Sequence, residues 1–179
     1  GRLGGCNQNC AFCAQSVHYD TAVDKAPQLL TNEQIISAAK EANEKGVPNL
    51  GIVYSGKKVP DEEIDRLIDL ISEIKNSYGV EICASFGILE KKDFEKLRKA
   101  GFVRYNHNIE TSQRHFSNIV TTHEYTDRVQ TIRNAIEAGF KVCAGGIFGV
   151  GENDEDRVDM ALELRDLKVD MVPLNFLHP

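Results

Sequence analysis

The sequence lacks the features that mark several classes of protein. Basic residues are not in excess, since 21 Lys and Arg stand against 27 Asp and Glu and the net charge is −6. This balance argues against a protein that binds nucleic acid regardless of base sequence. No apolar run approaches the roughly 18–20 residues of a transmembrane helix, and no signal peptide opens the chain. Position 1 is Gly rather than Met, so we expect the chain to begin at a fragment boundary.

Cysteine is scarce and unevenly distributed. There are five cysteines, an odd number, and three of them lie within eight residues near the N-terminus. This spacing is poor for a disulfide framework and typical of metal binding. Because no secretory signal is present, we expect a reducing, cytoplasmic location. The cysteines are Cys6, Cys10, Cys13, Cys83 and Cys143.

Short β-branched runs alternate with longer segments of helical period along the whole chain. This pattern predicts parallel strands joined by right-handed crossovers. We therefore expect one α/β domain over residues 1–179, a TIM-type barrel of (βα) repeats that stops at about six units, because a complete barrel takes about 250 residues. An open doubly wound sheet fits the same alternation. The expected strands are residues 1–4, 50–54, 80–86, 102–109, 141–148 and 171–177, and the expected helices begin at Thr31, Asp61, Lys91, Thr126 and Asp154.

The segment from Cys6 to Cys13 has the pattern C-x₃-C-x₂-C and follows the first expected strand. Three thiolates on a short loop can hold three irons of a four-iron cluster. No fourth cysteine lies nearby, so one iron would stay open for a small molecule, which indicates catalysis. The alternative is a structural zinc site, but such sites usually have four protein ligands at two-residue spacings.

This cysteine motif, with the aromatic Phe12 before its last cysteine, resembles that of the radical S-adenosylmethionine (SAM) superfamily. Further blocks resemble the biotin synthases within it, namely residues 13–16, 105–112, 119–122, 141–147 and 172–177. The resemblance implies a (βα)₈ barrel with a [4Fe–4S] cluster at which SAM is cleaved to a 5′-deoxyadenosyl radical. It further implies hydrogen abstraction and sulfur insertion into dethiobiotin to give biotin. The implied partners are a reductant protein such as flavodoxin or ferredoxin and a second copy in a homodimer, with no nucleic acid and no membrane.

The resemblance also assigns binding roles to particular residues. Asn108 and Glu110 lie two apart at the end of an expected strand, so both side chains can share one face. A carboxylate can accept hydrogen bonds from both ribose hydroxyls, although relatives usually carry Asp at the position of Glu110. The alternatives are a solvated loop charge for Glu110, a helix-surface charge for Arg128 and a buried core amide for Asn175. The implied SAM-binding residues are Phe12, Asn108, Glu110, Arg128 and Ile147, and the implied substrate-binding residues are Asn106, Asn108 and Asn175.

Ile147 lies in a glycine-rich run, residues 145–152, that fits the superfamily pattern G-x-I-x-G-x-x-E. Its glycines would allow close backbone approach to the adenine ring, against which Ile147 would pack. The run lacks the spacing of a dinucleotide fingerprint and the Lys-Ser/Thr of a P-loop.

A second, [2Fe–2S], cluster is typical of biotin synthases, and here its ligand set is incomplete. Cys83 and Cys143 match two of the three expected cysteines, but Gly51 stands where the third belongs. The arginine ligand would come from a later strand. The chain can therefore hold a different auxiliary cluster, generate the radical without inserting sulfur, or lack the activity, and the two cysteines can also be simple buried hydrophobes. The alternatives to a biotin synthase are a hydrogenase cofactor maturase, a methylornithine synthase-like enzyme, and an inactive cluster-binding fragment.

Overall fold

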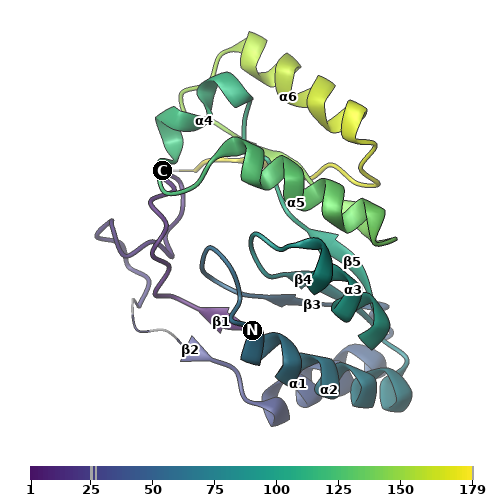
Figure 1. The fold of residues 1–179 in the computed structure, drawn as a ribbon. Coiled ribbons are helices and arrows are strands. Elements are labelled where there is room, and N and C mark those ends of the chain that lie inside the picture. The colour runs from purple at the N-terminus through teal and green to yellow at the C-terminus, as the bar shows by residue number, and fades with distance from the viewer. Residues whose placement is uncertain (25, 27, 179) are drawn as a thin grey trace.

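A computed structural model describes residues 1–24, 26 and 28–178 of the chain. Helices and strands alternate through it, as the sequence predicts (Figure 1). The helices are α1 (Asn32–Glu44), α2 (Asp61–Tyr78), α3 (Lys91–Ala100), α4 (Gln113–Ile119), α5 (Tyr125–Glu137) and α6 (Asp154–Leu167). The strands are β1 (Arg2–Leu3), β2 (Gln28–Leu29), β3 (Asn49–Val53), β4 (Glu81–Ser85), β5 (Phe102–Asn106), β6 (Lys141–Cys143), β7 (Gly146–Phe148) and β8 (Leu174–Phe176).

The central sheet has the order β3-β4-β5-β6, and every pair in it is parallel. Strands β7 and β8 form a second parallel pair, whereas β1 and β2 pair antiparallel, against the expectation of parallel strands only. Isolated parallel bridges from residue 2 to 54, 110 to 146 and 143 to 171 join these pieces in chain order. Among the described residues no pairing closes the strands into a barrel.

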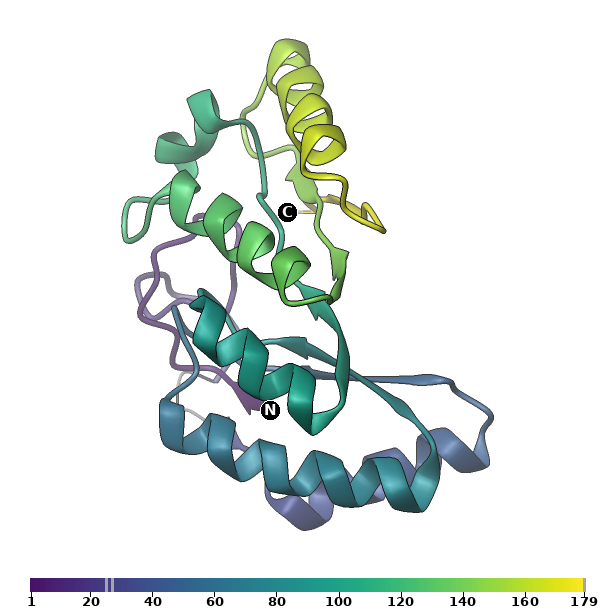
Figure 2. The same cartoon turned by 45° about the vertical axis from the view of Figure 1, so that its right-hand side comes forward.

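Helices α1, α2, α3 and α5 pack one after another along one face of the central sheet (Figures 1 and 2). Adjacent parallel strands with right-handed crossovers place every helix on the same side, as in a TIM barrel. A doubly wound sheet would have helices on both faces. The structure is therefore an α/β fold with singly wound parallel strands, and the doubly wound alternative is wrong for the part described.

Several helix boundaries agree with the sequence signals, and others differ. Thr31 caps α1 as predicted, its Oγ1 accepting a hydrogen bond of 3.3 Å from the backbone N–H of Gln34. The prediction that Asp61 caps α2 is wrong by one position, because Pro60 occupies the extended N-cap conformation. Asp61 is instead the first helical residue, where its charge favours the positive end of the helix. Helix α5 likewise starts one residue before Thr126.

Two local features depart from the predicted pattern. Helix α4 was not expected; it has seven residues and begins at the N-cap Ser112. The single strand expected at 141–148 is divided into β6 and β7. At this interruption a Cβ atom on Gly145 would collide with the carbonyl of Pro173, and one on Gly146 with the carbonyl of Glu110. Glycine is thus required at both positions because neighbouring backbone of the same chain approaches closely.

The hydrophobic core lies between the central sheet and the helices. Its largest fully buried side chains include several aromatic rings. Phe94 and Tyr105 meet edge to face with centroids 4.7 Å apart, and Phe86 meets Phe102 at 5.7 Å. Such contacts add about 0.5–1.5 kcal/mol each to the burial of the rings. The core thereby fixes β4 and β5, whose carboxyl ends carry the candidate site.

Candidate functional site

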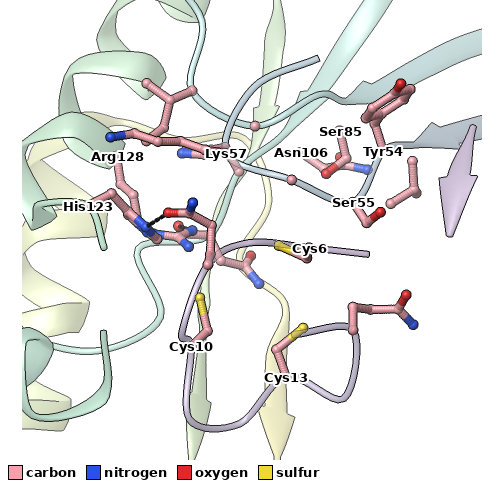
Figure 3. Close-up of a pocket in the computed structure, with 18 of the residues that line it drawn as sticks. Cys6, Cys10, Cys13, Tyr54, Ser55, Lys57, Ser85, Asn106, His123 and Arg128 are labelled. Carbon is pink, nitrogen blue, oxygen red and sulfur yellow. Dashed lines mark hydrogen bonds between the residues drawn. The ribbon is translucent and has the colours of Figure 1, made fainter. Parts of the chain in front are cut away.

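A cavity of about 380 Å³ opens at the carboxyl ends of β3, β4 and β5 (Figure 3). Its size is that of a small-molecule site. The carboxyl ends of neighbouring parallel strands meet at one edge, so polar residues that follow each strand gather there. The N-terminal loop covers this edge and brings all three predicted cluster cysteines to the cavity. Of the predicted residues, the cavity lining includes Cys6, Cys10, Phe12, Cys13, Asn106, Asn108, Glu110 and Arg128.

The segment that carries the three cysteines, residues 6–16 (here the cysteine loop), is closed by its own backbone. The N–H of Cys6 donates to the carbonyl of Gln15 at 3.1 Å, and the N–H of Cys13 donates to the carbonyl of Cys10 at 3.0 Å. Figure 3 shows the three sulfur atoms around one stretch of this loop. The C-x₃-C-x₂-C spacing therefore becomes a compact turn with all three thiols beside the same cavity.

Asn9 fastens the cysteine loop to the connection between α4 and α5. Its Oδ1 accepts from the N–H of Thr121 at 2.9 Å and from the hydroxyl of Thr122 at 3.1 Å, while its Nδ2 donates to the hydroxyl of Thr121 at 2.6 Å. The carbonyl of Ile119 also accepts from the N–H of Ala11 at 2.9 Å. The loop is thus held by a part of the chain more than a hundred residues away.

The donor set of this loop suits an iron–sulfur cluster. Burial raises the pKa of Cys10 to about 11 despite the nearby Arg128, so the free thiol is protonated and metal binding would displace its proton. Among the described residues, no group of three or more His, Cys, Asp or Glu side chains is arranged around one metal ion. In a four-iron cluster each thiolate binds a different iron, so the sulfurs need not converge on one point. The described residues therefore form no closed zinc site.

Glu110 and Arg128 form a buried ion pair at the cavity wall. The guanidinium of Arg128 donates to Oε1 of Glu110 at 3.3 Å and to the carbonyl of Asn108 at 2.8 Å. Burial raises the pKa of Glu110, and the charge of Arg128 opposes that rise. With 8% of its surface exposed, Glu110 is not a solvated loop charge, and Arg128 is not a helix-surface charge. The alternatives of a solvated loop charge and a helix-surface charge are therefore wrong.

Two polar atoms in the cavity wall lack hydrogen-bond partners among the described residues, Oδ1 of Asn106 and Nε2 of His107. An unsatisfied buried polar group costs about 1–3 kcal/mol, which a polar ligand in the cavity would offset. Burial lowers the pKa of His107 well below its usual value, so this ring is neutral. The neighbouring Asn108 is engaged, since its Oδ1 accepts from the N–H of Gly145 at 3.1 Å.

Two predicted binding residues, Ile147 and Asn175, are not part of the cavity lining among the described residues. They are paired in register on β7 and β8. Asn175 is exposed among the described residues. The turn after β7 is held by Glu152, whose carboxylate accepts from the backbone N–H groups of Gly149 and Val150 at 2.9 and 2.8 Å.

The auxiliary-cluster candidates lie on the sheet itself. Gly51 pairs in register with Cys83 on the adjacent strand, so the two positions lie side by side on the sheet. Cys143 lies on β6, separated from β4 by β5. Cys83 is level with Arg104 and Cys143 with Asn106, so two strand spacings and a two-residue offset place the two Cα atoms more than about 10 Å apart, too far for a disulfide. Burial raises the pKa of both thiols, and the guanidinium of Arg104 on the intervening strand opposes that rise.

The structure places four further side chains at or near these groups, none of them among the residues predicted from the sequence. Arg104 had an available signal, because it lies two residues before Asn106 on the same strand and so shares its face. Gln8 lies between two motif cysteines, but nothing in the sequence indicated its partner. The four residues are Gln8, Lys57, Arg104 and His123.

Comparison with known proteins identifies the family. The sequence matches the profile of the radical SAM superfamily over residues 2–164, which is most of the chain. The chain belongs to the radical SAM superfamily. Membership in the radical SAM superfamily implies a [4Fe–4S] cluster and SAM, and the cysteine loop beside the cavity supplies thiols of the right number and chemistry for that cluster.

Similar curated proteins are named biotin synthase. That of Akkermansia muciniphila is 46% identical over 179 residues, which is all of this radical SAM chain and 56% of that protein. That of Thermotoga petrophila is 49% identical over 178 residues, covering 99% of this chain and 59% of that protein. The predicted similarity to biotin synthases is therefore confirmed. The chain spans a little over half the length of these relatives.

Solved structures support the fold of this radical SAM chain. Methylornithine synthase superimposes with a TM-score of 0.84 at 22% identity, covering 99% of this chain and 52% of that one. HydG, a maturase of the [FeFe]-hydrogenase, gives 0.80 at 19% identity, covering 97% and 41%. At these identities the likeness concerns the fold alone. No helix of the described residues is both long and apolar enough to cross a membrane.

Proposed function

We propose that this chain is the SAM-cleaving part of a biotin synthase-like enzyme that inserts sulfur into dethiobiotin. The observation that carries the proposal is that the three motif cysteines share one cavity with Asn106, Asn108 and Glu110. Identities of 46–49% to biotin synthases support this substrate over those of the maturase and mutase alternatives, to which identity is 19–22%.

Cys6, Cys10 and Cys13 would hold three irons of the [4Fe–4S] cluster, leaving the fourth for SAM. When bound, the cluster supplies the electron for reductive cleavage of SAM. The contacts of Asn9 hold the cysteine loop against the α4–α5 connection, which would keep the thiols close together before metal binds. Cys6 and Cys10 are buried, which limits access of water to the cluster.

Glu110 would accept hydrogen bonds from the SAM ribose. Its partner Arg128 opposes the rise in pKa that burial causes, and in its charged form the carboxylate would bind hydroxyls more strongly than a neutral acceptor. The unpartnered Oδ1 of Asn106 and Nε2 of His107 would receive polar groups of SAM or substrate. Phe12 and Ile147 would contact the adenine ring, and Asn108 would lie between SAM and substrate. Asn175 would meet the ureido ring of dethiobiotin once further strands complete a TIM-type barrel around residues 1–179.

We further propose that Cys83 and Cys143 belong to an auxiliary-cluster site, [2Fe–2S] or another type, that this chain fills incompletely. Arg104 lies between these strands and carries a positive charge, which favours an anionic cluster. Electrons would come from a flavodoxin- or ferredoxin-like reductant in the cytoplasm, and the enzyme would act as a homodimer.

Anaerobic reconstitution with iron and sulfide tests the proposal. We expect close to four irons for the cysteine loop, an electron paramagnetic resonance (EPR) signal that shifts on addition of SAM, and 5′-deoxyadenosine after reduction. A colourless zinc protein, or a cluster whose EPR signal does not change on addition of SAM, would contradict the proposal. Extending the chain to the length of its relatives and supplying dethiobiotin then tests the substrate, since formation of biotin separates this function from the maturase and mutase alternatives.

A further inference from the structure

One imidazole connects the cysteine loop to the Arg128–Glu110 pair. Nδ1 of His123 lies 2.9 Å from Oε1 of Gln8, the contact drawn as a dashed line in Figure 3. Nε2 of the same ring lies 3.0 Å from Nε of Arg128. Gln8 lies inside the cysteine motif, and Arg128 holds Glu110. His123 lines the cavity and contacts both parts of the proposed SAM-cleaving site.

The partners determine how this ring is protonated. A guanidinium N–H can only donate, so Nε2 of His123 must accept and carries no proton. The proton then resides on Nδ1 and is donated to Oε1 of Gln8. The amide of Gln8 is oriented consistently, because its Nε2 donates to Oδ1 of Asn7 at 2.8 Å. The ring is therefore neutral, and its one donor and its one acceptor each make a hydrogen bond.

The surroundings keep the ring neutral and in place. Burial, helped by the charges of Arg128 and Lys57 and opposed by that of Asp127, lowers the pKa of His123 to about 4. The ring packs edge to face against Phe116 with centroids 5.7 Å apart. The guanidinium of Arg128 lies 5.8 Å from the centre of the same Phe116 ring. His123 and Arg128 are thus packed on one aromatic support.

We propose that His123 is a positioning residue that sets the place of the cysteine loop relative to Arg128 and Glu110. Resting on the proposed function, this means that His123 sets the distance between the cluster and bound SAM. A displacement of about 1 Å at a reacting centre can lower a rate by about 100-fold. The proposal depends only on the contacts of His123 with Gln8 and with Arg128. Gln8 and His123 are 115 residues apart in the sequence.

The first test uses the metal-free chain and measures alkylation of individual thiols by iodoacetamide. Cys10 and Cys83 are both buried, so each reacts only when its surroundings open. In His123→Phe, which removes both hydrogen bonds, we expect Cys10 to react about 10-fold faster than in the wild type while Cys83 is unchanged. An unchanged Cys83 shows that the fold is intact. Equal Cys10 rates in wild type and His123→Phe would overturn the proposal.

Matched variants separate the two contacts. In His123→Gln the amide oxygen can occupy the place of Nε2 and accept from Arg128, whereas in His123→Asn the amide nitrogen can occupy the place of Nδ1 and donate to Gln8. We expect His123→Asn to restore slow alkylation of Cys10 more fully than His123→Gln does. Gln8→Leu should accelerate the alkylation of Cys10 as much as His123→Phe does. The double variant should react little faster than either single variant, because both substitutions remove the same contact. Additive effects would show that His123 does not act through Gln8.

The second test uses the reconstituted chain. His123→Phe should keep the wild-type iron content but cleave SAM about 10–100-fold more slowly, with a weaker EPR shift on SAM binding. Wild-type cleavage and shift in this variant would refute the positioning role. If the wild type itself binds no four-iron cluster, the proposed function fails, and the alkylation test still decides whether His123 holds the loop.

Discussion

The carbonyl oxygen of Glu110 occupies the space where a side chain at position 146 would begin. Glu110 has a positive φ of 71°, which a residue with a Cβ rarely adopts. Its carbonyl accepts from the N–H of Ile147 at 2.8 Å, which joins the strand end to β7. The close approach of Gly146 therefore fixes the backbone that directs the Glu110 carboxylate toward Arg128.

Gly146→Ala should destabilise the chain by about 1–3 kcal/mol, because its Cβ would collide with the Glu110 carbonyl and the sulfur of Met160. Gly51→Ala is a matched control, since nothing lies within 4 Å of a Cβ at that position. Urea denaturation followed by circular dichroism compares the two. Equal midpoints for both variants would contradict the argument from close approach.

Replacing Cys6, Cys10 or Cys13 with Ala should abolish the SAM-cleaving cluster, because three ligands are the minimum that anchors four irons. Iron and acid-labile sulfide are counted after anaerobic reconstitution. Cys83→Ala serves as the control, since Cys83 lies on β4 and is not part of the cysteine loop. Close to four irons with intact SAM cleavage in Cys10→Ala would remove the assignment of this loop.

Glu110→Gln keeps the shape of the side chain and removes its charge. Loss of a charge-assisted hydrogen bond costs about 1.5–3 kcal/mol, so SAM affinity should fall by roughly 10–100-fold. Titration of SAM onto the reconstituted chain measures the dissociation constant. Glu137→Gln, at an exposed ion pair with Lys91, should leave it unchanged. An unaltered constant in Glu110→Gln would show that this carboxylate does not bind SAM.

Gly51→Cys should improve binding of a second cluster by placing a third thiol directly beside Cys83. The site has room for the new side chain. Wild type should bind a second cluster weakly or not at all, because two of four ligand positions would lack protein donors. Iron beyond four per chain, with the visible bands of a [2Fe–2S] centre, is the expected gain. A stoichiometric second cluster in wild type would show that other side chains complete the site. Arg104 would then be the first residue to test by substitution.

Glu152 should contribute to stability at neutral pH and lose that contribution in acid. Burial alone would raise its pKa, but hydrogen bonds from Gly149, Arg157 and Val150 lower it from 4.5 to about 2. A depressed folded-state pKa stabilises the fold above pH 4.5, and this stabilisation disappears as the pH falls toward 2. Glu152→Gln should therefore lose about 1–2 kcal/mol at pH 7 and show a shallower decline in acid. Exposed Glu95→Gln is the control, and parallel acid curves for wild type and Glu152→Gln would contradict this role.

The sequence by itself determined the alternation of strands and helices and the chemistry of the motif. Helices α1, α3 and α6 begin within a residue of their signals, because an N-cap or a change in hydrophobic period acts over a few neighbouring positions. The cysteine spacing likewise predicts a cluster loop from covalent distances alone. Asn108 and Glu110 both line the cavity, but β5 ends at Asn106, so the backbone that follows the strand, rather than strand alternation, places them there.

Only the tertiary structure decided which of these residues meet. The contacts of Gln8 with His123 and of Asn9 with Thr121 span 115 and 112 residues, so no local rule could pair them. The register that sets Gly51 beside Cys83 depends on how β3 and β4 align, and periodicity does not specify that alignment. The burial that raises the pKa of Glu110 and lowers that of His123 arises only when the cysteine loop closes over the strand ends, because desolvation is a property of the packed chain rather than of any residue in it.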